Sequence, residues 1–255
     1  NNTINKWDKE LIQRAWHEKN IMFALVSGRF RAGLTSIADE MQIPCILSCF
    51  NGNYVEWQGA VINDVSIDLR IVKDIISLIE EAGLVPVVFD KDTYYVNSHT
   101  KWYDKMHSVF NIQGHIASWF SFYTQWHCNN HSVYKVLARD ADDNKLRAFE
   151  KKLKSLQYPG IETFRSASSI LEVLPAGTTK ANTLDHLSRY LKIDKTRIMC
   201  FGDYMNDYDM IKKCPHGVAM GNALNEVKEV AWYVTRTNDE CGIAHALEKF
   251  VFFSA

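Results

Sequence analysis

The sequence predicts an α/β protein in which a Rossmann-like, doubly wound parallel sheet carries an inserted α+β domain. Short apolar runs alternate with amphipathic segments near both ends of the chain, for example at 21–26 and 197–201. A long stretch of different texture, rich in aromatic residues, separates these two blocks. We therefore expect residues 1–64 and 174–255 to form the core domain and residues 65–173 the inserted domain.

The first block justifies this prediction element by element. Trp7, Leu11 and Ala15 recur at helical spacing, and the apolar run 21–26 has the length and composition of a buried parallel strand. The elements expected after it are a helix from about residue 30 to 42, a strand at 45–50 and a hairpin of 54–57 with 60–62.

The middle of the chain mixes strands and helices. The expected elements are a helix at 69–81, a strand at 85–89, a strand at 133–138, a helix at 143–156 and strands at 161–164 and 170–174. Residues 99–131 receive no assignment, because their aromatic side chains follow no regular period: Trp102, Tyr103, Phe110, Trp119, Phe120, Phe122, Tyr123 and Trp126. This aromatic region 102–126 is expected to form domain core, with stacking on a substrate ring as the alternative.

Regular alternation resumes in the last block. We expect a helix at 179–191, a strand at 197–201, a Gly-Asp loop leading into a helix, and short strands at 216–220 and 232–235. Asn238, Asp239 and Glu240 then cap a final helix, with acidic residues in its first turn, where the helix dipole favours them.

Length and composition exclude several classes of protein. The 255 residues are 47% hydrophobic and 23% charged, as in ordinary globular proteins, and the net charge of −1 is unlike that of a general nucleic-acid binder. The longest apolar runs are far shorter than the roughly 18 residues that span a bilayer. We expect a cytoplasmic protein with a small-molecule partner and no nucleic-acid or membrane partner; the oligomeric state is left open.

Six cysteines are scattered without a C-x-x-C pair, which favours free thiols in a reducing compartment over a disulfide framework. The cysteines are Cys45, Cys49, Cys128, Cys200, Cys214 and Cys241. The chain begins with Asn-Asn and not with Met. We therefore expect that Asn1 is not a translation start.

The sharpest chemical motif is GDYMND at residues 202–207, directly after an apolar strand. Ligands of open α/β sheets bind beyond the carboxyl ends of the strands, and a pair of carboxylates there suits a hard cation such as Mg2+. Asp203 and Asp207 are the candidate pair. The alternative is a capped helix, with Asp203 as its N-cap and Asp207 solvated.

Two weaker signals lie at equivalent places. Ser27 and Gly28 follow the strand 21–26 and offer a hydroxyl and free amides to an anion, although Ser27 could equally be an ordinary N-cap. Lys180 stands in the first turn of a helix, where a cation opposes the helix dipole unless an anion is near. Together with Asp203, these residues describe a phosphate site beside an acid-bound metal.

In this set of motifs the sequence resembles the haloacid dehalogenase superfamily, and within it the Cof-like hydrolases with a class II cap of the B subtype. The text CFGDYMNDYDM at 200–210 and HGVAMGNA at 216–223 is similar to that group's fourth motif and its continuation. LVSGR at 25–29 is similar to the second motif, and Lys180, after Glu172 and Pro175, to the third. The segment SCFNG at 48–52 resembles the loop before the cap.

The resemblance implies a Mg2+-dependent phosphatase of small phosphorylated metabolites, such as sugar phosphates, that acts through an aspartyl-phosphate. By position in the motifs, Asp203 would bind Mg2+ and Asp207 would complete the metal site as a supporting carboxylate. Lys180, Ser27, Gly28 and Asn206 would contact the phosphoryl group. Lys180, Asp203 and Asp207 are accordingly the candidate catalytic residues.

One departure from the family pattern concerns the nucleophile. The family's first motif, Asp-x-Asp-Gly-Thr, has no counterpart in this sequence, and Asp8 falls inside the helix that would follow it. We therefore expect this chain to be a fragment of the active enzyme, lacking one central strand. A non-catalytic phosphate-binding or regulatory protein and a phosphomutase on the same scaffold stay open as alternatives.

Two further clusters have modest interpretations. His127, Cys128 and His131 could be read as a metal cluster, but they lack a second matching pair, so a loop of the inserted domain is favoured. The acidic run Asp140, Asp142 and Asp143 is expected to form a solvated turn and helix start.

Overall fold

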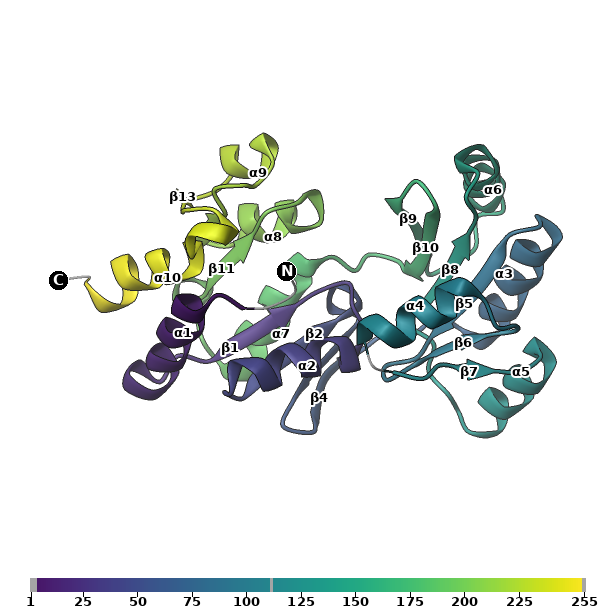
Figure 1. Ribbon diagram of the computed structural model, residues 1–255, viewed down its shortest axis with the longest axis horizontal. Helices are drawn as coiled ribbons and strands as arrows, with labels where there is room; N and C mark the ends of the chain where they lie inside the picture. The colour runs from purple at the N-terminus through teal and green to yellow at the C-terminus, as the bar shows by residue number, and fades with distance from the viewer. Residues whose placement is uncertain (1–3, 111, 254–255) are drawn as a thin grey trace. The chain divides into compact units, whose positions relative to one another are not determined.

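The structure is a computed structural model that describes residues 4–110 and 112–253, and it divides into two compact units (Figure 1). Unit 1 comprises the residues up to Gly28, Leu34–Asn63 and the residues from Thr179 onward. Unit 2 comprises Arg29–Gly33 and Asp64–Thr178. Unit 2 thus ends at Thr178, beyond the expected residue 173, and includes a short piece of the first block.

Unit 1 holds the elements of the two terminal blocks. Its helices are α1 (Lys6–Lys19), α2 (Arg31–Met41, whose first residues belong to unit 2), α7 (Lys180–Leu191), α8 (Tyr208–Lys213), α9 (Asn225–Glu229) and α10 (Gly242–Leu247). Its strands are β1 (Phe23–Val26), β2 (Cys45–Cys49), β3 (Tyr54–Trp57), β4 (Ala60–Asp64), β11 (Met199–Gly202), β12 (His216–Ala219) and β13 (Tyr233–Val234). Short helical turns are η1 (Phe50–Gly52), η2 (Lys195–Arg197), η3 (Met205–Asp207), η4 (Asn238–Glu240) and the π-helical η5 (Glu248–Phe252).

Unit 2 holds the elements of the middle of the chain. Its helices are α3 (Leu69–Glu81), α4 (Lys101–Phe110), α5 (Trp119–Cys128) and α6 (Asp143–Ser155). Its strands are β5 (Val85–Phe89), β6 (Tyr94–Val96), β7 (His115–Ile116), β8 (Lys135–Arg139), β9 (Ile161–Ala167) and β10 (Ile170–Pro175). No helix in residues 4–110 and 112–253 is long and apolar enough to cross a membrane.

The strands of unit 1 form two sheets. One has the order β1-β2-β3-β4, with β1 and β2 parallel and β2 and β3 antiparallel, and the other has the order β11-β12-β13, with all strands parallel. Among the described residues, β1 pairs only with β2, and β11 pairs only with β12. Each sheet therefore ends in an edge strand whose carboxyl end carries one of the predicted polar loops.

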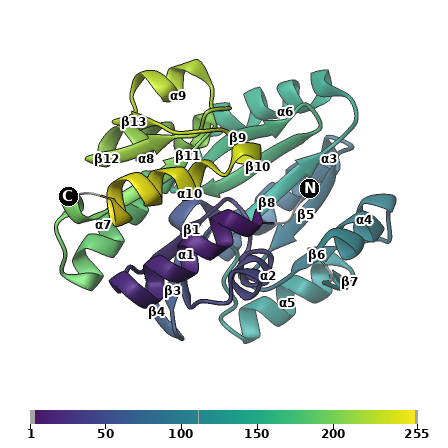
Figure 2. The ribbon, with the colours of Figure 1, turned by 60° about the vertical axis from the view of Figure 1, so that its left-hand side comes forward.

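Helices cover both faces of the β1–β4 sheet because its strands are apolar on both sides. Phe23 and Leu25 of β1 pack with α1, α2 and α10, whereas Ala24, the residue between them, packs on the other face in a cluster that includes Leu187 of α7. α1 and α10 lie side by side, as Figure 2 shows. The backbone N–H of Ala244 in α10 donates to the buried Asp8 carboxylate of α1 at 2.7 Å. This doubly covered parallel architecture confirms the predicted fold class.

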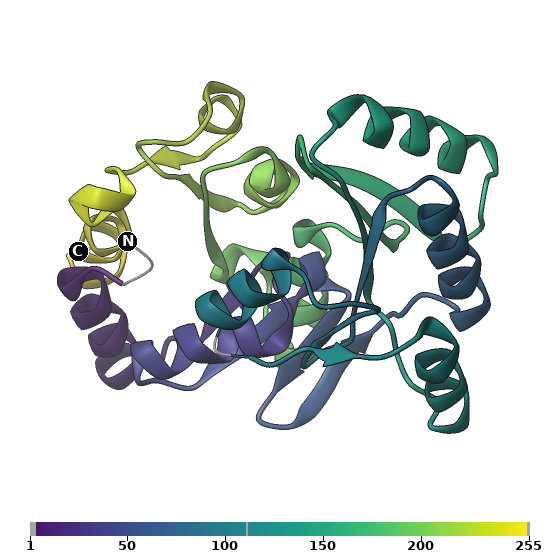
Figure 3. The same cartoon turned by 45° about the vertical axis from the view of Figure 1, so that its right-hand side comes forward.

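Unit 2 is an α+β domain built on one six-stranded sheet of order β7-β6-β5-β8-β10-β9. α3, α5 and α6 cover one face of this sheet, as Figure 3 shows. α3 presents Val72, Ile75, Ile76 and Ile79 to the sheet at helical spacing, and all four are buried. The other face of the sheet carries α4, whose Trp102 ring contacts Phe89 and Tyr94 edge-on.

The aromatic region divides between core and surface. Phe122 and Trp126 are four residues apart on α5, are buried and stack at 5.8 Å, whereas Phe120, two residues before Phe122, is 84% exposed. The side chain of Phe110 lies outside the described residues. Apolar residues on both sides of α5 hide the helical period. This explains why no element was predicted between 99 and 131, where the structure has α4, β7 and α5.

A buried carboxylate organises the β5–β6 hairpin of unit 2. Asp90 accepts hydrogen bonds from the Tyr95 hydroxyl at 2.7 Å and from the backbone N–H groups of Asp92 and Thr93, and it lies 3.1 Å from Nε2 of His131. Burial acts to raise the pKa of Asp90, but the bonds from His131, Tyr95 and the backbone outweigh it, and the net shift of the pKa is downward.

We predict that Asp90→Ala lowers the free energy of unfolding of unit 2 by about 2–3 kcal/mol, because buried donors lose their acceptor. Since the folded-state pKa of Asp90 is depressed, its stabilisation is present above the ordinary carboxyl pKa and is lost as the pH falls through the folded-state value. Urea unfolding between pH 3 and pH 7 should therefore show a smaller loss of stability at acid pH in Asp90→Asn than in the parent. Parallel curves would contradict this assignment.

Candidate functional site

The candidate site lies at the carboxyl ends of β1 and β11 in unit 1. β11 ends at Gly202 and is followed by Asp203 and the turn η3, while β1 ends at Val26 and is followed by Ser27 and Gly28. Val26 packs against the cluster that contains Ala181 of α7 and Cys200 of β11, so these strand ends share one part of the unit. This is the edge at which open α/β sheets bind their ligands.

A buried ion pair joins α7 to the β11 loop. Nζ of Lys180 lies 2.7 Å from Oδ1 of Asp207, and both side chains are almost fully buried, at 10% and 7% exposed. A Cβ on Gly202 would lie 2.4 Å from Cβ of Asp207, so the turn brings Asp207 this close only because residue 202 is glycine. The anion that a lysine in the first helical turn requires is therefore Asp207.

The second carboxylate oxygen of Asp207 binds the backbone of the same loop. Oδ2 accepts from the backbone N–H groups of Asp203 and Tyr204, each at 3.1 Å. Both carboxylate oxygens of Asp207 are thus occupied by protein donors. Asp207 is buried, and Asp203 is no N-cap because η3 begins at Met205 behind Tyr204. The capped-helix alternative, with Asp203 as the cap and Asp207 solvated, is wrong.

Two asparagines from distant loops hold the Asp203 carboxylate. Oδ2 of Asp203 accepts from Nδ2 of Asn222 at 3.3 Å and from Nδ2 of Asn238 at 3.2 Å. The backbone N–H of Asn238 donates to Oδ1 of Asn222 at 2.8 Å, which ties the two loops to each other. Among residues 4–110 and 112–253, Oδ1 of Asp203 has no hydrogen-bond partner. This asparagine pair was not predicted, because nothing in the sequence links positions so far apart.

The Ser27–Gly28 loop is held by η1. The backbone N–H of Ser27 donates to the carbonyl of Ser48, and the backbone N–H of Asn51 donates to the carbonyl of Ser27, both at 2.9 Å. A Cβ on Gly28 would lie 3.3 Å from Oδ1 of Asn51. This amide oxygen is buried and has no partner among the described residues, and it was not predicted as part of the site. α2 begins only at Arg31, so Ser27 is not its N-cap.

η1 also connects this loop to the start of α7. The hydroxyl groups of Ser48 and Thr183 lie 2.8 Å apart and are buried. Gly52 has φ +101°, and a Cβ there would lie 3.0 Å from Oγ1 of Thr183 and 3.5 Å from the carbonyl oxygen of Thr179. The Ser27 loop, η1 and the first turn of α7 are therefore packed at one place. Asn206, the remaining predicted phosphate contact, is exposed on η3.

The site contains few groups that could bind a hard cation. No group of three or more His, Cys, Asp or Glu that could hold a metal occurs within residues 4–110 and 112–253. Asp203 nevertheless offers Oδ1, because both asparagines donate to Oδ2. Since Mg2+ is often bound through one or two protein carboxylates, with water and substrate phosphate oxygens as its other ligands, the site fits Mg2+ through Asp203.

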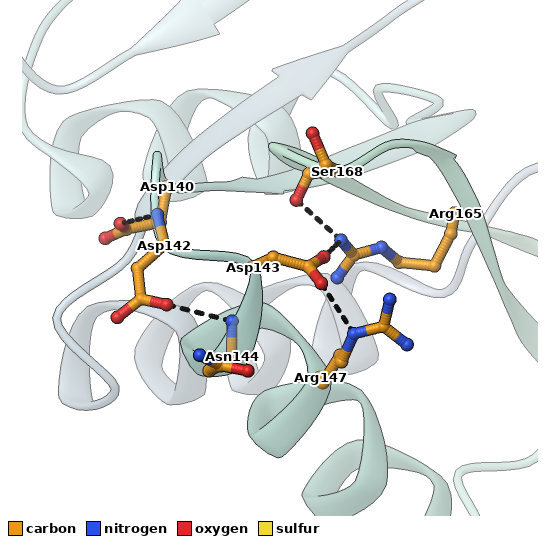
Figure 4. Close-up of polar contacts among 7 residues, drawn as sticks. All are labelled: Asp140, Asp142, Asp143, Asn144, Arg147, Arg165 and Ser168. Atoms are coloured by element: carbon orange, nitrogen blue, oxygen red, sulfur yellow. Dashed lines mark hydrogen bonds and ion pairs between the residues drawn. The ribbon is translucent and has the colours of Figure 1, made fainter.

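The other predicted clusters have structural roles. Nε2 of His127 lies 3.2 Å from the Tyr123 hydroxyl, His131 faces Asp90 and Tyr95, and Cys128 is exposed. Figure 4 shows the acidic run after β8, in which Asp142 caps α6 by accepting from the N–H of Asn144. Asp143 pairs with the guanidinium groups of Arg147 and Arg165. A turn and helix start was predicted here, and the structure confirms it.

Comparison with known proteins identifies the family. Residues 1–247 match the model of the haloacid dehalogenase-like hydrolases, and the chain belongs to this family. It is 25% identical over 277 residues to the 5-amino-6-(5-phospho-D-ribitylamino)uracil phosphatase YwtE of Bacillus subtilis (strain 168), covering 97% of this chain and 92% of that protein.

Solved structures agree with this assignment. A haloacid dehalogenase-like hydrolase from Bacteroides thetaiotaomicron superposes with a TM-score of 0.85 at 26% identity, covering 96% of this chain and 92% of that one. The HAD subclass IIB sugar phosphatase BT4131 gives a TM-score of 0.76 at 25% identity, covering 97% and 92%. The family is one of phosphatases and related hydrolases, as the resemblance of the motifs implied.

We predict strong coupling between Lys180 and Asp207 in stability. Removal of one partner leaves a buried charge uncompensated, so Lys180→Met or Asp207→Leu alone should each lower the free energy of unfolding by about 3–5 kcal/mol. The double variant should lose clearly less than the sum of the two single losses. Urea unfolding of the four proteins measures the coupling, and strictly additive losses would show that the pair is not formed.

Proposed function

We propose that the protein is a Mg2+-dependent phosphatase of small phosphorylated metabolites, such as sugar phosphates, that acts through an aspartyl-phosphate. The observation that carries the proposal is the buried Lys180–Asp207 pair, which holds an ammonium group at the strand edge beside Asp203 and the loop that η1 ties to the start of α7. Phosphoryl transfer is catalysed mainly by positioning and by charge neutralisation, and a fixed cation beside a metal-binding carboxylate supplies both.

The residues of this chain have distinct roles in the proposal. The hydroxyl of Ser27, the backbone N–H of Gly28 and the side chain of Asn206 donate to the phosphoryl oxygens, and Lys180 neutralises part of their charge. Asp203 would hold Mg2+, and the ion would supply further neutralisation of the phosphoryl group. Asp207, whose oxygens are bonded to Lys180 and to the loop, positions both of these groups and makes no direct metal contact.

The nucleophile in this proposal lies on a strand between β1 and β11. Both are edge strands among the described residues, and Val26 at the end of β1 packs in the cluster that includes Cys200 of β11. One parallel strand between them would join the two sheets and bring its own carboxyl end to Ser27 and Asp203. We propose that this strand ends in Asp-x-Asp-Gly-Thr and is encoded upstream of Asn1. An open reading frame that starts near Asn1 without this motif would favour the non-catalytic alternative.

We predict that Asp203→Asn abolishes turnover of an aryl phosphate by the protein expressed from its complete gene, because the change removes charge while keeping shape. Titration calorimetry with Mg2+ should show weaker binding to the same variant. Near-normal activity of Asp203→Asn at saturating Mg2+ would refute the role of this carboxylate.

Lys180 and Ser27 should act on the same phosphoryl group. We expect Lys180→Ala to reduce kcat/KM by about 2–4 kcal/mol of transition-state stabilisation, and Ser27→Ala by about 0.5–1.5 kcal/mol, since one removes a charge and the other a neutral hydrogen bond. The double variant should be non-additive. Thermal melts must accompany the kinetics, because Lys180 also contributes to folding. Additive losses, or a Lys180→Ala protein as active as the parent, would show that the two residues do not act on the same phosphoryl group.

A further inference from the structure

Two cysteines of unit 1 meet where β11 packs against the end of α8. Cys200 is the second residue of β11, and Cys214 directly follows the last residue of α8. Both are free thiols, and they are 8% and 5% exposed. Both belong to the apolar cluster that also contains Ala181, the residue after Lys180. The two thiols therefore lie in the part of unit 1 that supports the candidate site.

Hydrogen bonds hold each cysteine against the element that carries the other. Sγ of Cys200 lies 3.6 Å from the carbonyl oxygen of Met210 in α8, and the backbone N–H of Cys214 donates to the same oxygen at 3.0 Å. Sγ of Cys214 donates to the carbonyl of Ile198, the residue before β11, at 3.2 Å. The two thiols are also hydrogen-bonded to each other. They are thus in contact while the backbone on both sides holds them in place.

The contact between the thiols makes the two sulfurs chemically different. The hydrogen bond raises the pKa of Cys200 and lowers that of Cys214, because the Cys214 thiolate accepts from the Cys200 thiol. Cys45 provides a contrast, since its sulfur lies 3.9 Å from Sδ of Met41 and burial raises its pKa to about 11. A thiolate is the form of cysteine that oxidants attack, so Cys214 is the sulfur that should react first.

The chain between the two cysteines carries the candidate metal ligand and its support. Cys200 lies two residues before Gly202, whose lack of a side chain permits the close approach of Asp207. Cys214 ends α8, the helix that begins directly after Asp207. A covalent bond between the two sulfurs would therefore join both ends of the segment that contains Asp203 and Asp207.

We propose that Cys200 and Cys214 are a redox site that closes to a disulfide in the presence of hydrogen peroxide, and that the disulfide reversibly lowers the activity of the adjoining site. The Cys214 thiolate attacks one peroxide oxygen and breaks the O–O bond, which leaves a sulfenic acid on Cys214 and releases hydroxide. The hydroxide becomes water by taking the proton that Cys214 lost. The Cys200 sulfur then displaces the sulfenic hydroxyl, which leaves as a second water with the Cys200 proton.

The new bond would change the geometry of the segment between the cysteines. A disulfide holds its sulfurs at about 2.05 Å, much closer than two hydrogen-bonded thiols. β11 and the end of α8 must then approach each other, or the sulfurs must leave the carbonyls of Met210 and Ile198. A displacement of about 1 Å can lower a catalytic rate about 100-fold. The effect on turnover rests on the proposed function, whereas the disulfide itself does not.

Peptide mapping tests the disulfide in the protein expressed from its complete gene. The protein is treated with hydrogen peroxide at neutral pH, the excess is removed with catalase, free thiols are alkylated, and the peptides are identified by mass spectrometry. Cys200→Ser and Cys214→Ser are treated in the same way, because serine keeps the hydrogen-bonding group but cannot form a disulfide. Cys45→Ser, at another partly buried thiol of unit 1, is the matched control.

The parent and Cys45→Ser should yield one peptide pair linked through Cys200 and Cys214, and dithiothreitol should return both as free thiols. The linked pair should be absent from Cys200→Ser and Cys214→Ser. The site is refuted if both thiols are still alkylated when the exposed Cys128 is oxidised, or if the bond forms only in urea. A variant that thermal melts show to be unfolded is left out, since the parent and Cys45→Ser then decide.

Turnover of 4-nitrophenyl phosphate tests the second half of the proposal. Oxidation should lower kcat/KM of the parent and of Cys45→Ser by about five-fold or more, and dithiothreitol should restore it. An equal loss in Cys200→Ser, or a fully formed disulfide with unchanged turnover, would overturn the regulatory effect. A reduced parent without any turnover would refute the proposed function and with it this effect, while peptide mapping still decides whether the redox site exists.

Discussion

The structure of the candidate site depends on one buried ion pair. Lys180 and Asp207 lie 2.7 Å apart with little exposure, and each is costly to bury without the other. The pair joins the first turn of α7 to the loop after β11, and the remaining oxygen of Asp207 fixes the backbone that carries Asp203. The positions of the ammonium group and of the candidate metal ligand are thus set by the same carboxylate.

Around this pair, the site is built from short-range constraints that meet from several loops. Gly202 permits the close approach of Asp207, and Gly52, in a left-handed conformation, permits the contact of η1 with α7. Asn222 and Asn238 restrain the Asp203 carboxylate from one side and leave its second oxygen without a protein donor among the described residues. Charge is therefore held in place before a ligand arrives, which is the condition under which charged groups stabilise a phosphoryl group most.

Unit 2 shows a different use of polar groups. The face of its sheet under α3, α5 and α6 is apolar core, whereas the other face carries the Lys135–Glu172 pair, the aromatic rings around Trp102 and the guanidinium of Arg139. Burying aliphatic residues on this face would cost less free energy than burying charged ones.

The sequence alone predicted the alternation of strands and helices in the two terminal blocks, because apolar runs such as 21–26 and 197–201 have the length and composition of buried parallel strands. It also made Ser27, Lys180, Asp203 and Asp207 candidate site residues, since each stands just behind a strand or at the start of a helix. It did not resolve α4, β7 and α5, where aromatic residues such as the exposed Phe120 obscure the helical period.

Only the tertiary structure decided which partner each charge has. The sequence motif made Asp207 a candidate metal ligand, yet its oxygens are bonded to Lys180 and to two backbone N–H groups. The roles of Asn222 and Asn238 depend on Asp203, which lies far away in the chain. Hydrogen bonds and ion pairs act over a few ångströms in space, and spacing along the chain carries no record of which distant residues will meet.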